Sequence, residues 1–111
     1  DPGYERVTRI KVSPANVPAL VAVLTQLEKE IQEAGHDTYI NGLYTAIGGG
    51  TQEAGTLTLR HITEDEKTMG AVFDDYFTGA SWADTWLQAT LLIDEVVSDR
   101  FEVCEQFYAA E

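Results

Sequence analysis

The sequence predicts one α+β domain whose elements follow the order β-α-β-β-α-β. Three features of the 111-residue chain carry this prediction: a long amphipathic segment from Val17 to Ile31, an alternating segment from Thr56 to Ile62, and a broken helical region after it. A chain of this length fits one domain, 1–111, and leaves little room for another. Its 44% hydrophobic and 23% charged residues are typical of a globular protein.

The first strand and the first helix are the most clearly marked elements. Residues Glu5 to Val12 alternate and end apolar, as a half-buried strand does. Asn16 stands where a helix N-cap is expected, and Pro18 then falls in the first turn, where its missing N–H costs nothing. Gly35 is a favourable residue just beyond the end of this helix. The apolar stripe of the helix consists of Val17, Leu20, Val21, Leu24, Leu27 and Ile31.

Two more strands are predicted on either side of a glycine-rich loop. Thr38 to Ile47 is rich in aromatic and β-branched residues, and Thr56 to Ile62 alternates between apolar and polar side chains. The loop between them begins at Gly48-Gly49-Gly50 and runs to Gly55. A hairpin is the simplest arrangement of two strands joined in this way.

The second helical region is predicted to be broken into two pieces. Thr63 and Glu66 form a capping box at its start, Gly79 interrupts it, and Ser81 can cap the second piece. A last strand from Arg100 to Tyr108 completes the split βαβ, or ferredoxin-like, order, in which helices cover one face of a four-stranded antiparallel sheet. The apolar side of the second helical piece consists of Trp82, Trp86, Ala89, Ile93 and Val97.

Several strands carry apolar or aromatic side chains on both faces, as at Leu43 and Tyr44 or at Val7 and Ile10. Helices on one side of the sheet would leave the other side open, so something else must cover it. A second copy of the sheet is an economical cover. The sequence therefore predicts a homodimer that packs through the sheet face. A lone subunit at micromolar concentration in the ultracentrifuge would contradict this.

The element order, the Gly-Ala-Ser break before Trp82 and the closing segment Phe101–Phe107 together resemble the dimeric α+β barrel superfamily. That group includes antibiotic biosynthesis monooxygenase-like, NIPSNAP-like and EthD-like proteins and haem-degrading relatives. The resemblance extends from Arg6 to Phe107. It implies two subunits that face each other through their sheets, with a cavity between sheet and helices in each. The superfamily hosts unrelated chemistries, so the resemblance specifies the fold better than the activity.

Charge restricts the partners of the chain. Nineteen acidic residues oppose seven basic ones, for a formal charge of −12. A surface this negative repels phosphate backbones and anionic lipids, so neither nucleic acid nor a membrane is expected as a partner. The single Cys104 excludes an intrachain disulfide. The chain begins with Asp1 rather than methionine, which leaves a cytoplasmic location and export with a removed signal peptide both open.

His61 is the main candidate for a catalytic side chain in this sequence. It has the same parity as Leu57 and Leu59, so it is expected to point toward a buried face. There it would act as a general base or proton shuttle, although a core-edge histidine bonded to a neighbour is the plainer alternative. Asn41 lies in a predicted strand, where asparagine is disfavoured, and this favours a polar cavity beside it.

Aromatic residues are the other candidates for a site. Trp82 and Trp86 are four positions apart and share a helix face. With Tyr44, Tyr39 or Tyr76 they could line a pocket for a planar, apolar ligand. Aromatic residues at this spacing more often belong to the core, which is the competing interpretation.

The leading functional hypothesis is cofactor-independent oxidation or isomerisation of a small aromatic compound. The resemblance implies it, because some oxygenases of the superfamily position a polyphenol and dioxygen with an asparagine, a tryptophan and a histidine or tyrosine. Here His61 would take a proton from a phenol, Asn41 would steady the oxyanion, and the tryptophans would sandwich the ring. A non-catalytic small-molecule-binding protein and a structural dimer with a filled core are the alternatives, and haem binding through His61 is a weaker one.

No cofactor and no metal are expected. The two histidines and Cys104 do not have the spacing of a zinc site. The glycine run at 48–50 lacks the Gly-Lys-Ser/Thr ending of a phosphate-binding loop.

Overall fold

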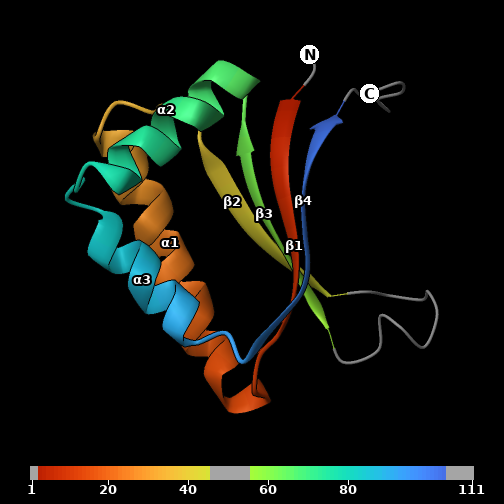
Figure 1. The fold of residues 1–111 in the computed structure, drawn as a ribbon. Helices are drawn as coiled ribbons and strands as arrows, with labels where there is room; N and C mark the ends of the chain where they lie inside the picture. Colours follow the sequence, from red (N-terminus) through yellow and green to blue (C-terminus); the bar gives the residue numbers. More distant parts are fainter. Residues whose placement is uncertain (1–2, 46–55, 105–111) are drawn as a thin grey trace, which may run out of the picture.

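The computed structural model describes residues 3–45 and 56–104, and it places the helices together on one face of a single antiparallel sheet (Figure 1). Four strands lie in the order β2-β3-β1-β4. Their bounds are β1 Gly3–Lys11, β2 Ile40–Thr45, β3 Leu57–Thr63 and β4 Glu95–Cys104. The helical elements are the 3-10 helix η1 Pro14–Asn16, α1 Val17–Glu33, α2 Glu66–Phe77 and α3 Ala83–Leu91. The predicted α+β, ferredoxin-like fold is confirmed.

Helix α1 follows the predicted stripe with one exception. Val21 is 47% exposed, because it lies beside the stripe rather than within it. Asn16 occupies the N-cap position but makes no side-chain capping bond, because η1 leads directly into the helix. Gly35 has a φ of 109°, a conformation that residues with a Cβ rarely adopt, and it ends the helix as predicted. The buried residues of α1 are Leu20, Leu24, Leu27 and Ile31.

The break in the second helical region is confirmed, but both predicted caps are wrong. Gly79, with a φ of 90°, separates α2 from α3. The cap of α2 is Asp65, whose carboxylate accepts a hydrogen bond from the backbone N–H of Thr68 at 2.7 Å. Thr63 cannot take that role because it is the last residue of β3. At the start of α3 the cap position belongs to Trp82 rather than Ser81.

Strand β4 begins at Glu95 rather than at the predicted Arg100, and Val97 belongs to it rather than to the preceding helix. The backbone N–H of Asp94 donates to the carbonyl of Lys11 at 2.9 Å and joins the start of β4 to the end of β1. The segment from 98 to 100 is polar and so does not look like a strand, yet it pairs with β1 along its length. The part of the predicted strand after 104 lies outside the described residues, as does the predicted loop at 48–55.

The strand register places four side chains in a row on the face that carries the helices. Asn41 of β2 is paired with His61 of β3, which is paired with Arg6 of β1, which is paired with Phe101 of β4. We call these four residues the site row. Because side chains alternate between the two faces of a sheet, all four point toward the helix layer.

The opposite, outer face of the sheet combines apolar and charged side chains. Arg60 lies 3.0 Å from Glu5 and 3.8 Å from Glu102, and Arg100 lies 2.7 Å from Glu102. Arginines thus pair with acidic residues on this face. The ring of Tyr44 lies beside Arg60, with 5.9 Å between the guanidinium carbon and the ring centroid. The structure is that of one copy of the chain, so a homodimer through this face stays a prediction.

Candidate functional site

A buried chain of hydrogen bonds ends on His61. The hydroxyl of Tyr39 lies 2.6 Å from Nδ1 of His61. The side-chain amide of Asn41 donates to that same hydroxyl at 3.3 Å and to the carbonyl oxygen of Leu24 at 2.9 Å. Tyr39 is 0% exposed and His61 is 4% exposed, so water does not compete for these bonds.

Burial keeps both rings neutral. Desolvation, with the nearby positive charge of Arg6 as a second cause, lowers the pKa of His61 to about 3, and the charge of Asp99 opposes this only in part. Burial also raises the pKa of the Tyr39 hydroxyl, which therefore keeps its proton. At neutral pH the pair is an uncharged phenol beside an uncharged imidazole.

Aromatic side chains from the helices cover the imidazole. The indole of Trp86, in α3, stacks on His61 with 4.6 Å between ring centroids and 18° between ring planes. Tyr76 and Phe73, in α2, lie 5.7 and 6.1 Å from Trp86. Phe73 in turn meets the edge strand, with its centroid 6.1 Å from that of Phe101. The aromatic surface thus runs from α3 across α2 to β4.

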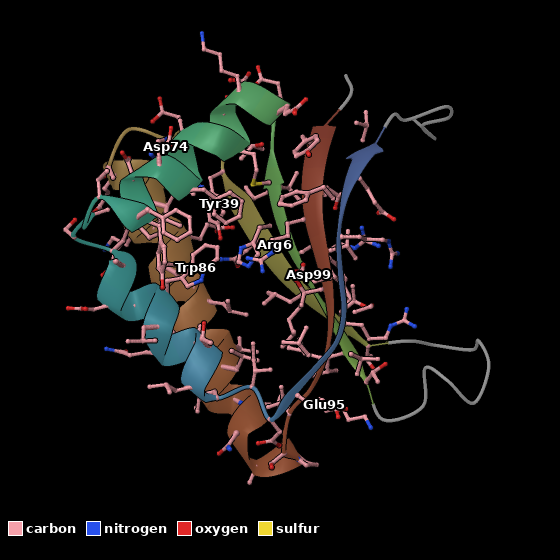
Figure 2. The ribbon with its side chains drawn as sticks, in the orientation of Figure 1. Arg6, Tyr39, Asp74, Trp86, Glu95 and Asp99 are labelled. Carbon is pink, nitrogen blue, oxygen red and sulfur yellow. The ribbon has the colours of Figure 1, made fainter. Side chains whose placement is uncertain are left out.

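Arg6 and Asp99 are the charged residues of the site, and they form an ion pair. Nη2 of Arg6 lies 2.7 Å from Oδ2 of Asp99 and its Nε lies 3.0 Å from Oδ1. The hydroxyl of Thr8 also donates to Asp99, at 2.9 Å. The bond from Arg6 is the main reason that the pKa of Asp99 lies below its usual value. Figure 2 shows Arg6 between Trp86 and Asp99, in the space between helices and sheet.

Two spaces adjoin this cluster, and Arg6 and Trp86 line both. The inner cavity, of about 100 Å³, lies between α1, α3 and the sheet, and His61 is part of its wall. The outer hollow, of about 350 Å³, is bounded by α2, α3, β1 and β4. Its aromatic lining consists of Phe73, Tyr76, Phe77, Trp86 and Phe101.

The structure brings most of the predicted site residues together, with corrections for three of them. His61, Trp86 and Tyr76 are neighbours. Tyr44 lies on the outer face, since it is paired with Thr58 in a register that turns it away from His61. The predicted pocket containing Tyr44 is therefore wrong.

The other two corrections concern the roles predicted for Trp82 and Asn41. Trp82 is fully buried and packs beneath Trp86, with 5.9 Å between ring centroids, but it lines neither space. Asn41 is present beside His61, yet its NH₂ group already donates to Tyr39 and Leu24. It is therefore occupied in holding the buried tyrosine and does not offer those donors to a ligand oxyanion.

Arg6 is the residue that sequence reasoning missed. Arg6, Thr8 and Ile10 stand at alternate positions of the first strand and therefore point to the same face. Because Ile10 has to face the core, this spacing indicates that Arg6 faces the core as well. A charged side chain at such a position must reach a polar partner or a cavity. The structure supplies both.

The described residues were also searched for a metal site and for a membrane-spanning helix. Within 3–45 and 56–104, no three His, Cys, Asp or Glu side chains gather as a metal ion would require. In the same part of the chain, no helix has the length and apolar character needed to cross a membrane.

Comparison with solved structures supports the fold. A candidate antibiotic biosynthesis monooxygenase from Chloroflexus aurantiacus superposes with a TM-score of 0.61 at 11% identity, covering 96% of this chain and 97% of that one. A NIPSNAP family protein of unknown function from Agrobacterium tumefaciens gives 0.62 at 11% identity, covering 96% and 91%. A candidate antibiotic biosynthesis monooxygenase from Bordetella bronchiseptica gives 0.62 at 12% identity, covering 97% and 100%.

Sequence comparison adds nothing to this. No family model matches the chain, and no curated protein matches it either. At identities this low, the likeness to solved structures establishes the fold alone. The chain thus has the ferredoxin-like α+β fold that antibiotic biosynthesis monooxygenase-like and NIPSNAP family proteins share.

Proposed function

We propose that the protein binds a planar aromatic small molecule in the outer hollow, with an oxygen of that molecule directed at Arg6. The observation that carries this is the convergence of five aromatic side chains, from α2, α3 and β4, around one arginine. The volume of about 350 Å³ is within the range of about 300–1,000 Å³ that small-molecule sites usually have. Such a space accommodates a bicyclic ring.

The lining of the hollow fits this ligand class. Aromatic walls offer both apolar area and edge-to-face contacts to a flat ring. Phe77 and Phe101 are 79% and 50% exposed, so a ligand would remove much of their apolar surface from water. Arg6 is the natural partner for a phenolate or carboxylate.

The formal charge of −12 opposes an anionic ligand only at long range. At physiological ionic strength the screening length is about 8 Å, so distant carboxylates act weakly on an ion held against a guanidinium. Asp99 is the close exception, and its ion pair with Arg6 offsets part of the guanidinium charge as well as its own. Local contacts therefore decide whether the ligand binds.

Calorimetric titration with 2-naphthoate tests the proposal. We expect saturable binding to the wild-type protein and a loss of about 5- to 30-fold in affinity for Phe101→Ala, equivalent to about 1–2 kcal/mol of lost ring contact. Tyr44→Ala is the matched control, because Tyr44 is 51% exposed against 50% for Phe101 but lies on the other face of the sheet. No heat of binding with the wild type, or equal losses in the two variants, would refute the site.

A second candidate function is cofactor-independent oxidation of the bound ring. It is favoured by the inner cavity of about 100 Å³, which shares Arg6 and Trp86 with the outer hollow and is large enough for dioxygen. Arg6 would stabilise the enolate of an anthrone-type substrate. The ring carbon that loses two hydrogens gains one oxygen atom, and the second oxygen atom leaves with those hydrogens as water. The likeness to candidate monooxygenases supports this at the level of the fold.

An oxygen electrode distinguishes this reaction from binding alone. With anthrone as substrate, an oxidase should give saturable oxygen uptake that Arg6→Gln lowers at least tenfold, as expected for the loss of an oxyanion partner. Arg100→Gln is the control, since Arg100 pairs with Glu102 on the outer face. Uptake no faster than in buffer would leave ligand binding as the function.

A further inference from the structure

The partners of Asn41 and Tyr39 show which atom is the donor in each hydrogen bond around Tyr39. The amide corner of Asn41 that lies 2.9 Å from the Leu24 carbonyl must be its NH₂ group, because a carbonyl oxygen only accepts. The same NH₂ group lies 3.3 Å from the Tyr39 hydroxyl and donates to it. The hydroxyl proton of Tyr39 is then directed at its other neighbour, Nδ1 of His61, 2.6 Å away.

A neutral imidazole whose Nδ1 accepts a hydrogen bond carries its own proton on Nε2. His61 is kept neutral by its burial and by the adjacent charge of Arg6. Among the residues at 3–45 and 56–104, the hydrogen bond that the structure gives the His61 ring is the one between Nδ1 and the Tyr39 hydroxyl. The ring meanwhile forms part of the wall of the inner cavity, which Arg6 also lines.

We propose that Tyr39 and Asn41 are positioning residues that hold His61 as its Nε2–H tautomer, so that His61 and Arg6 both present N–H donors to a ligand oxygen that reaches past Arg6 into the inner cavity. The inference rests on the proposed function, because the ligand ring would lie in the outer hollow, which His61 does not line, and Arg6 lines both spaces. It also narrows the ligand class to aromatic compounds whose polar group accepts hydrogen bonds at neutral pH, a carboxylate above all. His61 then acts as a donor, whereas the sequence predicts a general base.

The tautomer can be measured without any ligand. In protein labelled with ¹⁵N-histidine, long-range proton–nitrogen NMR correlations show which ring nitrogen of His61 carries the proton, and His36 is the internal reference. We expect the proton on Nε2 in the wild type. Tyr39→Phe removes the donor to Nδ1 and should give a mixture of tautomers or the Nδ1–H form. Tyr44→Phe, which removes a tyrosine hydroxyl on the outer face of the sheet, should leave the His61 signals unchanged.

Two results of this experiment overturn the positioning role. One is a wild-type His61 with its proton on Nδ1, and the other is an Nε2–H tautomer that survives in Tyr39→Phe. Because the NMR signal needs no ligand, both results are readable even if no aromatic compound binds. Failure of the proposed function, in contrast, appears in the calorimeter, as absent binding or as equal losses in Phe101→Ala and Tyr44→Ala.

The narrower ligand class has its own test. 2-Naphthoate and 2-naphthylmethylammonium have the same ring, but the polar group accepts hydrogen bonds in the first and donates them in the second. We expect the wild type to bind naphthoate at least tenfold more tightly, and Tyr39→Phe to reduce that preference. Equal affinity for the two compounds, or tighter binding of the ammonium, overturns the assignment of two converging donors.

Discussion

Replacing Trp82 with alanine is expected to lower the free energy of unfolding by about 3–5 kcal/mol, the range for a large aromatic residue removed from a packed core. Trp82 is 0% exposed, and its ring lies 6.0 Å from Tyr76 and 5.9 Å from Trp86 between centroids. The neighbours belong to helices on both sides of the Gly79 break and cannot close the resulting space without moving. Urea denaturation followed by circular dichroism measures the loss.

Two further variants show whether packing is the cause. Trp82→Phe keeps a buried ring and removes an indole N–H that has no hydrogen-bond partner among the described residues, so its loss should be clearly smaller. Leu87→Ala shortens a side chain of α3 that is 49% exposed, and should change stability by no more than about 0.5 kcal/mol. A Trp82→Ala protein as stable as Leu87→Ala would show that Trp82 is not a core residue.

The second large effect is a loss of stability at acidic pH. His61 takes up a proton near pH 6.5 when the chain is unfolded but only near pH 3 when it is folded, since its pKa is lowered to about 3. The unfolded state therefore binds more protons between these values, and stability falls as the pH falls through that window. The contribution of His61 is fully present above pH 6.5. We expect it to fall by about 2 kcal/mol between pH 7 and pH 5.

Urea denaturation at several values between pH 7 and pH 5 measures this dependence. The nineteen acidic residues are common to the wild type and the variants, so comparing the pH dependence of these proteins isolates the histidine. The His61→Gln protein should be less sensitive to pH than the wild type, whereas His36→Gln should keep the contribution of His61. Identical slopes in the wild type and in His61→Gln would contradict a buried, neutral imidazole.

Local patterns were sufficient to predict the fold. The spacing of Leu20, Leu24 and Leu27 depends on one helix, and the alternation through β3 depends on one strand, so neither needs a partner to be recognised. The cap of α2 was misassigned for a non-local reason. Thr63 is paired with Tyr4 of β1, and that pairing extends β3 as far as Thr63, the residue that the local motif made a helix cap.

The candidate site was only partly predictable, because its members meet through strand register. The position of His61 in its strand shows which face of the sheet it points to. It does not show that Arg6 lies beside it, because that depends on the register between β1 and β3. The face on which Tyr44 lies, in contrast, follows from the sequence. Asn41 and Tyr44 are three positions apart in one strand, so they have to point to opposite faces.

The site row has a consequence for how the protein folds. Its four members come from residues 6, 41, 61 and 101, one from each strand, so no single hairpin or helix contains a functional fragment. Contacts between such distant positions form slowly, because long stretches of chain must be closed first. Intermediates that lack the pairing of β1 with β4 would have no outer hollow for a ligand. A bound aromatic molecule would accordingly stabilise only states in which these two strands are paired.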